Sequence, residues 1–99
     1  MTDLTFPVPP SVTMRTINGF VADLRDACAD RKTLTLDIDA LSDADLSFVQ
    51  AVQAARVHLG SGLTLTRAAS GPLAALLVRA GFAGDPADID FWFHGENPQ

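Results

Sequence analysis

Four aspartates with no basic residue between them stand close together near the middle of the chain: Asp37, Asp39, Asp43 and Asp45. Clustered carboxylates bind divalent cations or take part in phosphoryl transfer. A calcium loop beginning at the first aspartate would need glycine as its sixth residue and glutamate as its twelfth. The chain has Ser42 and Phe48 at these positions, which excludes a calcium loop of this type.

The first two aspartates also form a D-x-D pattern, Asp37-Ile38-Asp39, at the end of a predicted strand. This pattern is similar to that of haloacid-dehalogenase-type phosphatases. Those enzymes and the receiver domains of response regulators need a lysine later in the chain, whereas the only lysine here, Lys32, precedes the aspartates. We therefore interpret the aspartates as turn and helix-capping residues in preference to metal ligands or catalytic groups. We expect no metal and no cofactor.

The other residues that could act as a nucleophile, act as a base or bind phosphate are not part of a recognisable motif. Cys28 falls on the apolar stripe of a predicted helix, which is typical of a small core residue. His58 and His94 are not near a serine or cysteine in a recognisable arrangement. The glycines of segment 60–62 follow a predicted helix and precede a predicted strand, the reverse of the order in phosphate-binding loops. We therefore expect that the chain is not an enzyme.

Alternating strands and helices position these residues. Alternation of apolar and polar residues predicts strands at 4–8, 34–38 and 63–66, and a 3.6-residue apolar period predicts helices at about 14–30 and 44–59. A third helix is predicted to begin near residue 70 and to end at Gly81. This order favours crossover connections and a largely parallel sheet. The off-face of the strands is polar, with Thr35 and Thr64 as examples, so we expect helices mainly on the other face. The predicted fold is a small α/β domain, a mostly parallel or mixed sheet of about four short strands with three helices.

The second predicted helix is preceded by a capping pattern. Ser42-Asp43-Ala44-Asp45 has the form S-x-x-D, in which the hydroxyl caps the helix and a carboxylate follows three residues later. The sequence therefore predicts Ser42 as the cap and Asp45 in the first turn, where the helix dipole favours negative charge.

Length and composition set further limits. The chain has 99 residues, which indicates a single domain spanning 1–99, and 47% of them are hydrophobic, which excludes a disordered chain. The net charge is −5, which argues against binding to nucleic acid or to an anionic membrane surface. No apolar run reaches the length of a membrane span, and the first residues do not have the pattern of a signal peptide. We expect a cytoplasmic protein.

Residues 84–99 form an acidic and aromatic tail. Phe91, Trp92 and Phe93 follow one another there, close to Ile89. A run this apolar must dock on another surface. That surface is either the domain's own core or a partner, which leaves a homodimer through the tail as an alternative.

Segment 34–50 resembles the signature of STAS domains (sulphate transporter and anti-sigma factor antagonist). In that family an apolar strand ends in Leu-Asp, and a short turn leads to an aspartate, one or two hydroxyl residues and an apolar helix. Leu36-Asp37 matches the strand end and Asp45 matches the second aspartate. Gly81-Phe82 also resembles the way the family's last helix closes. The resemblance covers about residues 4–82 and implies the STAS fold, a small α/β domain with a mixed sheet.

The resemblance implies a non-enzymatic, bacterial protein-interaction module of the anti-sigma factor antagonist type, which binds a histidine or anti-sigma-type kinase. The alternative is the small STAS subunit of a lipid-trafficking ABC transporter, bound to its ATPase. In the family the phosphorylated hydroxyl directly follows the aspartate, where this chain has Leu46, so Ser47 becomes the phosphorylation candidate. The partner-binding surface would consist of Asp39, Asp43, Asp45, Leu46, Ser47 and Gln50.

Overall fold

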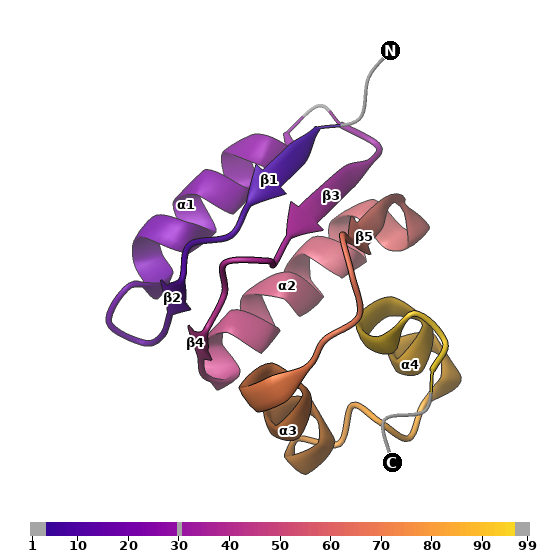
Figure 1. The fold of residues 1–99 in the computed structure, drawn as a ribbon. Coiled ribbons are helices and arrows are strands. Elements are labelled where there is room, and N and C mark those ends of the chain that lie inside the picture. The colour runs from indigo at the N-terminus through magenta and orange to yellow at the C-terminus, as the bar shows by residue number, and fades with distance from the viewer. Residues whose placement is uncertain (1–3, 30, 97–99) are drawn as a thin grey trace.

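A computed structural model describes residues 4–29 and 31–96 (Figure 1). In chain order the elements are β1 (Thr5–Pro7), β2 (Ser11–Val12), α1 (Ile17–Cys28), β3 (Leu34–Asp37), β4 (Asp43–Ala44), α2 (Leu46–Leu59), the 3-10 turn η1 (Gly60–Gly62), β5 (Leu63–Leu65), α3 (Gly71–Arg79) and α4 (Pro86–Phe93). None of the helices in the described part of the chain is long and apolar enough to cross a bilayer.

The strands form two sheets, and every strand pairing in them is parallel. One sheet has the order β1-β3-β5, and β2 pairs with β4 in a second, two-stranded sheet. In the larger sheet Thr35 of the central strand lies opposite Thr5 on one side and Thr64 on the other. The prediction of a small α/β fold with a mostly parallel sheet is therefore confirmed, because strand–helix–strand connections bring successive strands into parallel register.

The predicted counts of about four strands and three helices are wrong: the described residues form five strands and four helices. β2 and β4 have two residues each, which is too short for an alternating pattern to be recognised. The fourth helix, α4, falls in the segment interpreted as a tail. The sequence Asp85-Pro86 at its start is a known helix-start pattern: the Asp85 side chain accepts a hydrogen bond from the Ala87 N–H, and Pro86 occupies the first helical position.

The larger sheet has one buried and one polar face. Leu34 and Leu36 of β3 are buried, and the intervening Thr35 is only half-buried. The Thr35 and Thr64 hydroxyls lie 3.3 Å apart on the polar face. Figure 1 shows α1 and α2 together on one side of this sheet, with α3 and α4 at the end of the molecule away from the N-terminus.

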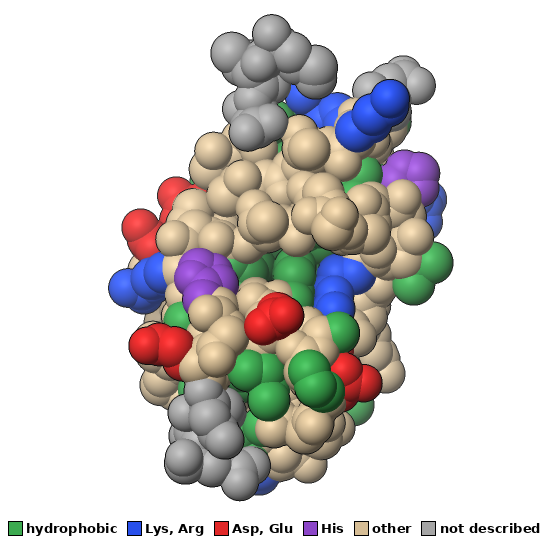
Figure 2. Space-filling model, turned by 90° about the vertical axis from the view of Figure 1, so that its right-hand side faces the viewer, with side chains coloured by type: hydrophobic (Ala, Val, Ile, Leu, Met, Phe, Trp, Pro, Cys, Tyr) green, Lys and Arg blue, Asp and Glu red, His purple; other side chains and the backbone are tan. Residues whose placement is uncertain are grey.

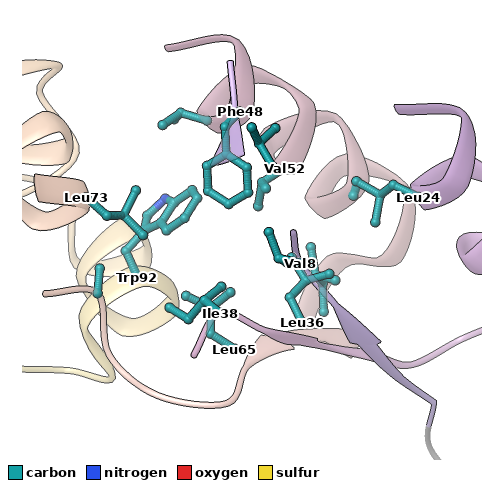
Figure 3. Packing of buried hydrophobic residues seen from close by; sticks show 14 of the residues in the cluster. Val8, Leu24, Leu36, Ile38, Phe48, Val52, Leu65, Leu73 and Trp92 are labelled. Atoms are coloured by element: carbon teal, nitrogen blue, oxygen red, sulfur yellow. The ribbon is translucent and has the colours of Figure 1, made fainter. Parts of the chain in front are cut away.

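The C-terminal aromatic residues complete the core (Figure 3). Trp92 is fully buried, with its ring centroid 6.3 Å from that of Phe48 in α2. The Ala69 N–H donates a hydrogen bond of 2.7 Å to the Trp92 carbonyl. Of the two alternatives for the tail, its apolar run at 89–93 thus docks on the domain's own core, and residues 97–99 of the predicted tail lie outside the described residues.

One glycine is required by close packing. Gly62 in η1 lies against the backbone of the segment before β3, and a Cβ at this position would overlap the Lys32 carbonyl oxygen. That oxygen belongs to the main chain and cannot rotate away as a side chain would. The approach of these two backbones sets how η1 leads into β5, next to β3.

Candidate interaction site at the start of α2

The start of α2 is capped by Asp45. Its backbone is extended, and one carboxylate oxygen accepts a hydrogen bond of 3.0 Å from the Ser47 N–H and a second one from the Ser47 hydroxyl. The prediction that Ser42 caps this helix is wrong, and so is a helix start at residue 44. Asp43 and Ala44 are extended in β4, so the helix cannot begin before Leu46, and the Ser42 hydroxyl instead lies 3.3 Å from the Pro10 carbonyl oxygen, to which it donates.

The second carboxylate oxygen of Asp45 reaches a different segment. It accepts a hydrogen bond of 2.9 Å from the Met14 N–H, in the loop between β2 and α1. The Ser47 hydroxyl, and after it the Met14 N–H, hold the pKa of the Asp45 carboxyl below its usual value, because both bonds favour the charged form. Asp45 is therefore an ionised group that fixes the β2–α1 loop to the start of α2.

Asp43 joins the same two segments. Its carboxylate lies 3.2 Å from the Ser11 hydroxyl, which donates to it, and Ser11 is also its partner in the β2–β4 ladder. The side chain of Asp43 is otherwise exposed. Asp43 and Asp45 are two residues apart in the chain, and both lie at the edge of one small surface.

Asp39 is held by another part of the fold. Its carboxylate oxygen lies 3.3 Å from the Arg67 Nε in the segment after β5, and both side chains are more than half exposed. The Asp39 N–H donates to the Asp37 carboxylate at 2.9 Å, which is a turn within the chain. The interpretation of these residues as turn and capping carboxylates agrees with the hydrogen bonds of Asp37, Asp39 and Asp45.

Two large apolar side chains are exposed beside the carboxylates. Leu46, the first residue of α2, is 46% exposed, and Met14 in the adjacent loop is 79% exposed. The Met14 N–H donates to the carboxylate of Asp45, the residue directly before Leu46. The exposed Gln50 follows Leu46 by four residues, which places it on the same face of the helix. We call Met14, Asp43, Asp45, Leu46 and Gln50 the α2-start surface.

Met14 was not anticipated as part of this surface. The sequence predicts a helix from about residue 14, whereas α1 begins at Ile17, after Thr16, whose side chain makes no capping hydrogen bond to the helix. The Thr16 hydroxyl instead accepts a hydrogen bond of 3.0 Å from the Thr13 N–H, which closes a turn before the helix. Only the pairing of β2 with β4 brings this loop to α2, and no local pattern around Met14 signals that pairing.

Ser47, the phosphorylation candidate, is only partly accessible in the structure. Its side chain is half-buried, and its hydroxyl donates to the Asp45 carboxylate. The neighbouring Phe48 is fully buried against the core. The serine thus stabilises the helix start in the unmodified protein.

Other polar residues lie away from this surface. The Cys28 thiol is buried, which raises its pKa and agrees with the prediction of a core residue. A hollow of about 650 Å³ lies between β5, α4 and the end of α2, with apolar side chains inside it and charged ones at its rim (Figure 2). Within residues 4–29 and 31–96, no three His, Cys, Asp or Glu side chains gather as they would around a metal ion.

In the hollow Arg56 connects α2 to the C-terminal helix. Its Nη1 lies 2.8 Å from the Asp88 carboxylate, and its guanidinium lies 4.5 Å above the ring of Phe91. No local sequence pattern indicates this pair, since 32 residues separate the arginine from the aspartate. The contacts fix α4 in place.

No protein-family model matches the chain, and no match was found among curated proteins or among solved structures. The resemblance of segment 34–50 to STAS domains stays a prediction.

Proposed function

We propose that this chain is a cytoplasmic, non-enzymatic interaction module with a STAS-like fold, which acts in bacterial signalling as an anti-sigma factor antagonist does and binds a kinase. The observation that carries the proposal is the α2-start surface. Exposed apolar side chains rimmed by polar ones are typical of protein–protein interaction sites. Here Leu46 and Met14 form the apolar centre, and Asp43 and Asp45 form the polar rim.

The charge of this surface indicates the kind of partner. Asp45 is ionised and Asp43 is exposed, and neither carboxylate has a basic partner within ion-pair distance in the described part of the chain. A kinase surface with a basic patch would be complementary to it. Such complementarity raises the association rate more than the final affinity, and salt weakens it.

Phosphorylation of Ser47 would act through Asp45. A phosphoserine carries about −1.5 to −2 charges at neutral pH. It would replace the hydroxyl that now donates to the carboxylate with a group that repels it. We propose that Asp45 then also loses its bond to the Met14 N–H, which frees the β2–α1 loop and changes the apolar centre that the kinase contacts.

The second candidate function is a STAS-like subunit docked permanently on the ATPase of a lipid-trafficking ABC transporter. The observation that favours it is the state of Ser47, which is half-buried and already bonded to Asp45. A serine in this state is suited to a constant helix cap. In this case the same surface would bind its partner without a switch.

An affinity pull-down from cells that produce the chain, with charge-reversal and control variants, tests the proposal. We expect wild type to retain a kinase and Asp43→Arg or Leu46→Arg to lose it. Asp26→Arg is the matched control, because Asp26 is an exposed aspartate on α1, outside the α2-start surface. Retention of the kinase by all variants would contradict the proposed surface, and retention of an ATPase in its place would favour the second function.

Association kinetics and mass spectrometry test the docking surface and the Ser47 phosphorylation switch separately. Asp43→Arg should slow association with the purified kinase at low salt and have little effect at high salt. Incubation with the kinase and ATP should add one phosphate to wild type and none to Ser47→Ala. If Ser47 stays unmodified while the kinase still binds, the switch is wrong and the docking surface stands.

A further inference from the structure

A groove lies between α1 and α2, away from the α2-start surface. Its volume is about 480 Å³, and its lining is mostly apolar. The floor consists of the buried residues Leu24, Cys28 and Ala55, whereas Arg25, Ala54 and His58 at the rim are exposed. A ligand in this groove would therefore be covered on one side only.

The dimensions of the groove fit a helix. The lining residues span 21–28 on α1, with Ala29 directly after its end, and 51–58 on α2, which is about two turns, or roughly 11 Å, on each wall. The α2 wall contributes three alanines, Ala51, Ala54 and Ala55. Small side chains let the ridge of another helix settle between two neighbouring helices.

The one-sided cover also favours a helix over a small molecule or an acyl chain. Sites for small ligands enclose most of the ligand surface. A partner helix needs to bury only one apolar stripe and leaves its other faces in water. An open groove with a buried floor can cover the apolar stripe of a helix, but it cannot enclose a small ligand.

The charge at the rim of the groove indicates what kind of helix would bind there. Apart from the Cys28 thiol, which burial keeps protonated, the ionisable groups that line the groove are Arg25 and His58. No carboxylate of the described residues lies within ion-pair distance of Arg25. Arg25 therefore places one positive charge at the rim of the groove, on a protein whose net charge is −5.

We propose that the α1–α2 groove binds an amphipathic helix of a partner protein, with the apolar stripe of that helix on the α2 alanines and an Asp or Glu side chain paired with Arg25. The carboxylate would also accept a hydrogen bond from the His58 ring. This site is separate from the α2-start surface, so the chain would join two partners or hold one partner at two places.

A display library of helical peptides tests the proposal. Each peptide has about 14 residues, a fixed Leu/Ala stripe and randomised polar positions, and selection uses the full chain. We expect the selected peptides to be enriched in Asp and Glu, and to shift the NMR signals of ¹⁵N-labelled amides in α1 and α2 around the groove. The Arg25→Glu variant should bind them roughly 3–10-fold more weakly, as expected for one reversed surface charge.

Control variants and competing ligands show whether a helix is the occupant of the groove. Arg79→Glu is the control, because Arg79 is an exposed arginine in the last turn of α3, as Arg25 is in the last turn of α1. Ala54→Phe should block the groove while circular dichroism shows an intact fold. A library without binders, binders without acidic enrichment, or shifts outside the groove would overturn the proposal. Binding of dodecanoate, but not of the peptides, in the groove would also overturn it. Concentration-dependent NMR shifts of the same amides in the chain alone would overturn it too, because they would indicate that a second copy occupies the groove. None of these results depends on the kinase, so they leave the proposed function standing.

Discussion

Replacing Trp92 by Ala and, separately, by Phe tests how α4 stabilises the domain. Trp92 is fully buried and packs edge-on against Phe91, at 4.9 Å between ring centroids, and against Phe82, at 6.5 Å. A buried tryptophan removes roughly 200 Å² from water, which corresponds to about 5 kcal/mol. We therefore expect Trp92→Ala to lower the free energy of unfolding by about 3–5 kcal/mol, in line with other large-to-small core substitutions.

The phenylalanine variant should behave differently because of one buried polar atom. The Trp92 Nε1 is buried and has no hydrogen-bond partner among the described residues. An unsatisfied buried donor costs about 1–3 kcal/mol. The smaller ring of Phe gives up roughly 2 kcal/mol of burial, and loss of the unpaired N–H offsets most of it. We expect Trp92→Phe to change the free energy of unfolding by less than about 1 kcal/mol.

Urea unfolding followed by far-ultraviolet circular dichroism measures both effects. Fluorescence is unsuitable because Trp92 is the only tryptophan in the chain. For a domain of this size, 1 kcal/mol corresponds to about 4–8 °C in Tm, so the loss of about 3–5 kcal/mol in Trp92→Ala should lower Tm by about 12–40 °C in a thermal melt. If Phe destabilises as much as Ala, the indole N–H is hydrogen-bonded in solution. If Ala costs less than about 1 kcal/mol, α4 is not docked as described.

Three further perturbations test other parts of the fold. Gly62→Ala should lower the free energy of unfolding by about 2 kcal/mol through overpacking. Gly19→Ala should raise it by about 0.5–1 kcal/mol, because nothing lies within 4 Å of the added Cβ in α1. Thermal melts compare the two variants directly, and equal effects would contradict the packing at η1. A double-mutant cycle with Arg56→Met and Asp88→Asn should give a coupling of about 1 kcal/mol, because each side chain is 20% exposed, and a coupling of zero would mean that the pair does not hold α4. The lowered pKa of Asp45 stabilises the fold above the unfolded-state pKa of about 3.9 and ceases to do so as the pH falls through the folded-state value. Asp45→Asn should therefore lose less stability than wild type when unfolding is compared at pH 5 and at pH 2.5, and an equal loss would refute the role given to this carboxyl.

The start of the helix that carries the candidate site shows how far local pattern reaches. The run of carboxylates and the apolar period after it correctly predict a strand, a turn and a helix near residues 34–59. The same pattern predicts a cap at Ser42, because S-x-x-D has the spacing of a capping box. What excluded it was the pairing of Asp43 with Ser11, a contact across 32 residues that no local pattern encodes.

By itself the sequence determined the α/β class, the parallel connections and the buried face of each main strand, since these follow from residue periods of two and 3.6. Tertiary structure decided which segments meet. It brings Met14 to Asp45 at the α2-start surface, packs Trp92 against Phe48, and leaves the groove between α1 and α2 open with Arg25 at its rim. Such contacts depend on the free energy of packing distant segments together, which periodicity along one segment does not record.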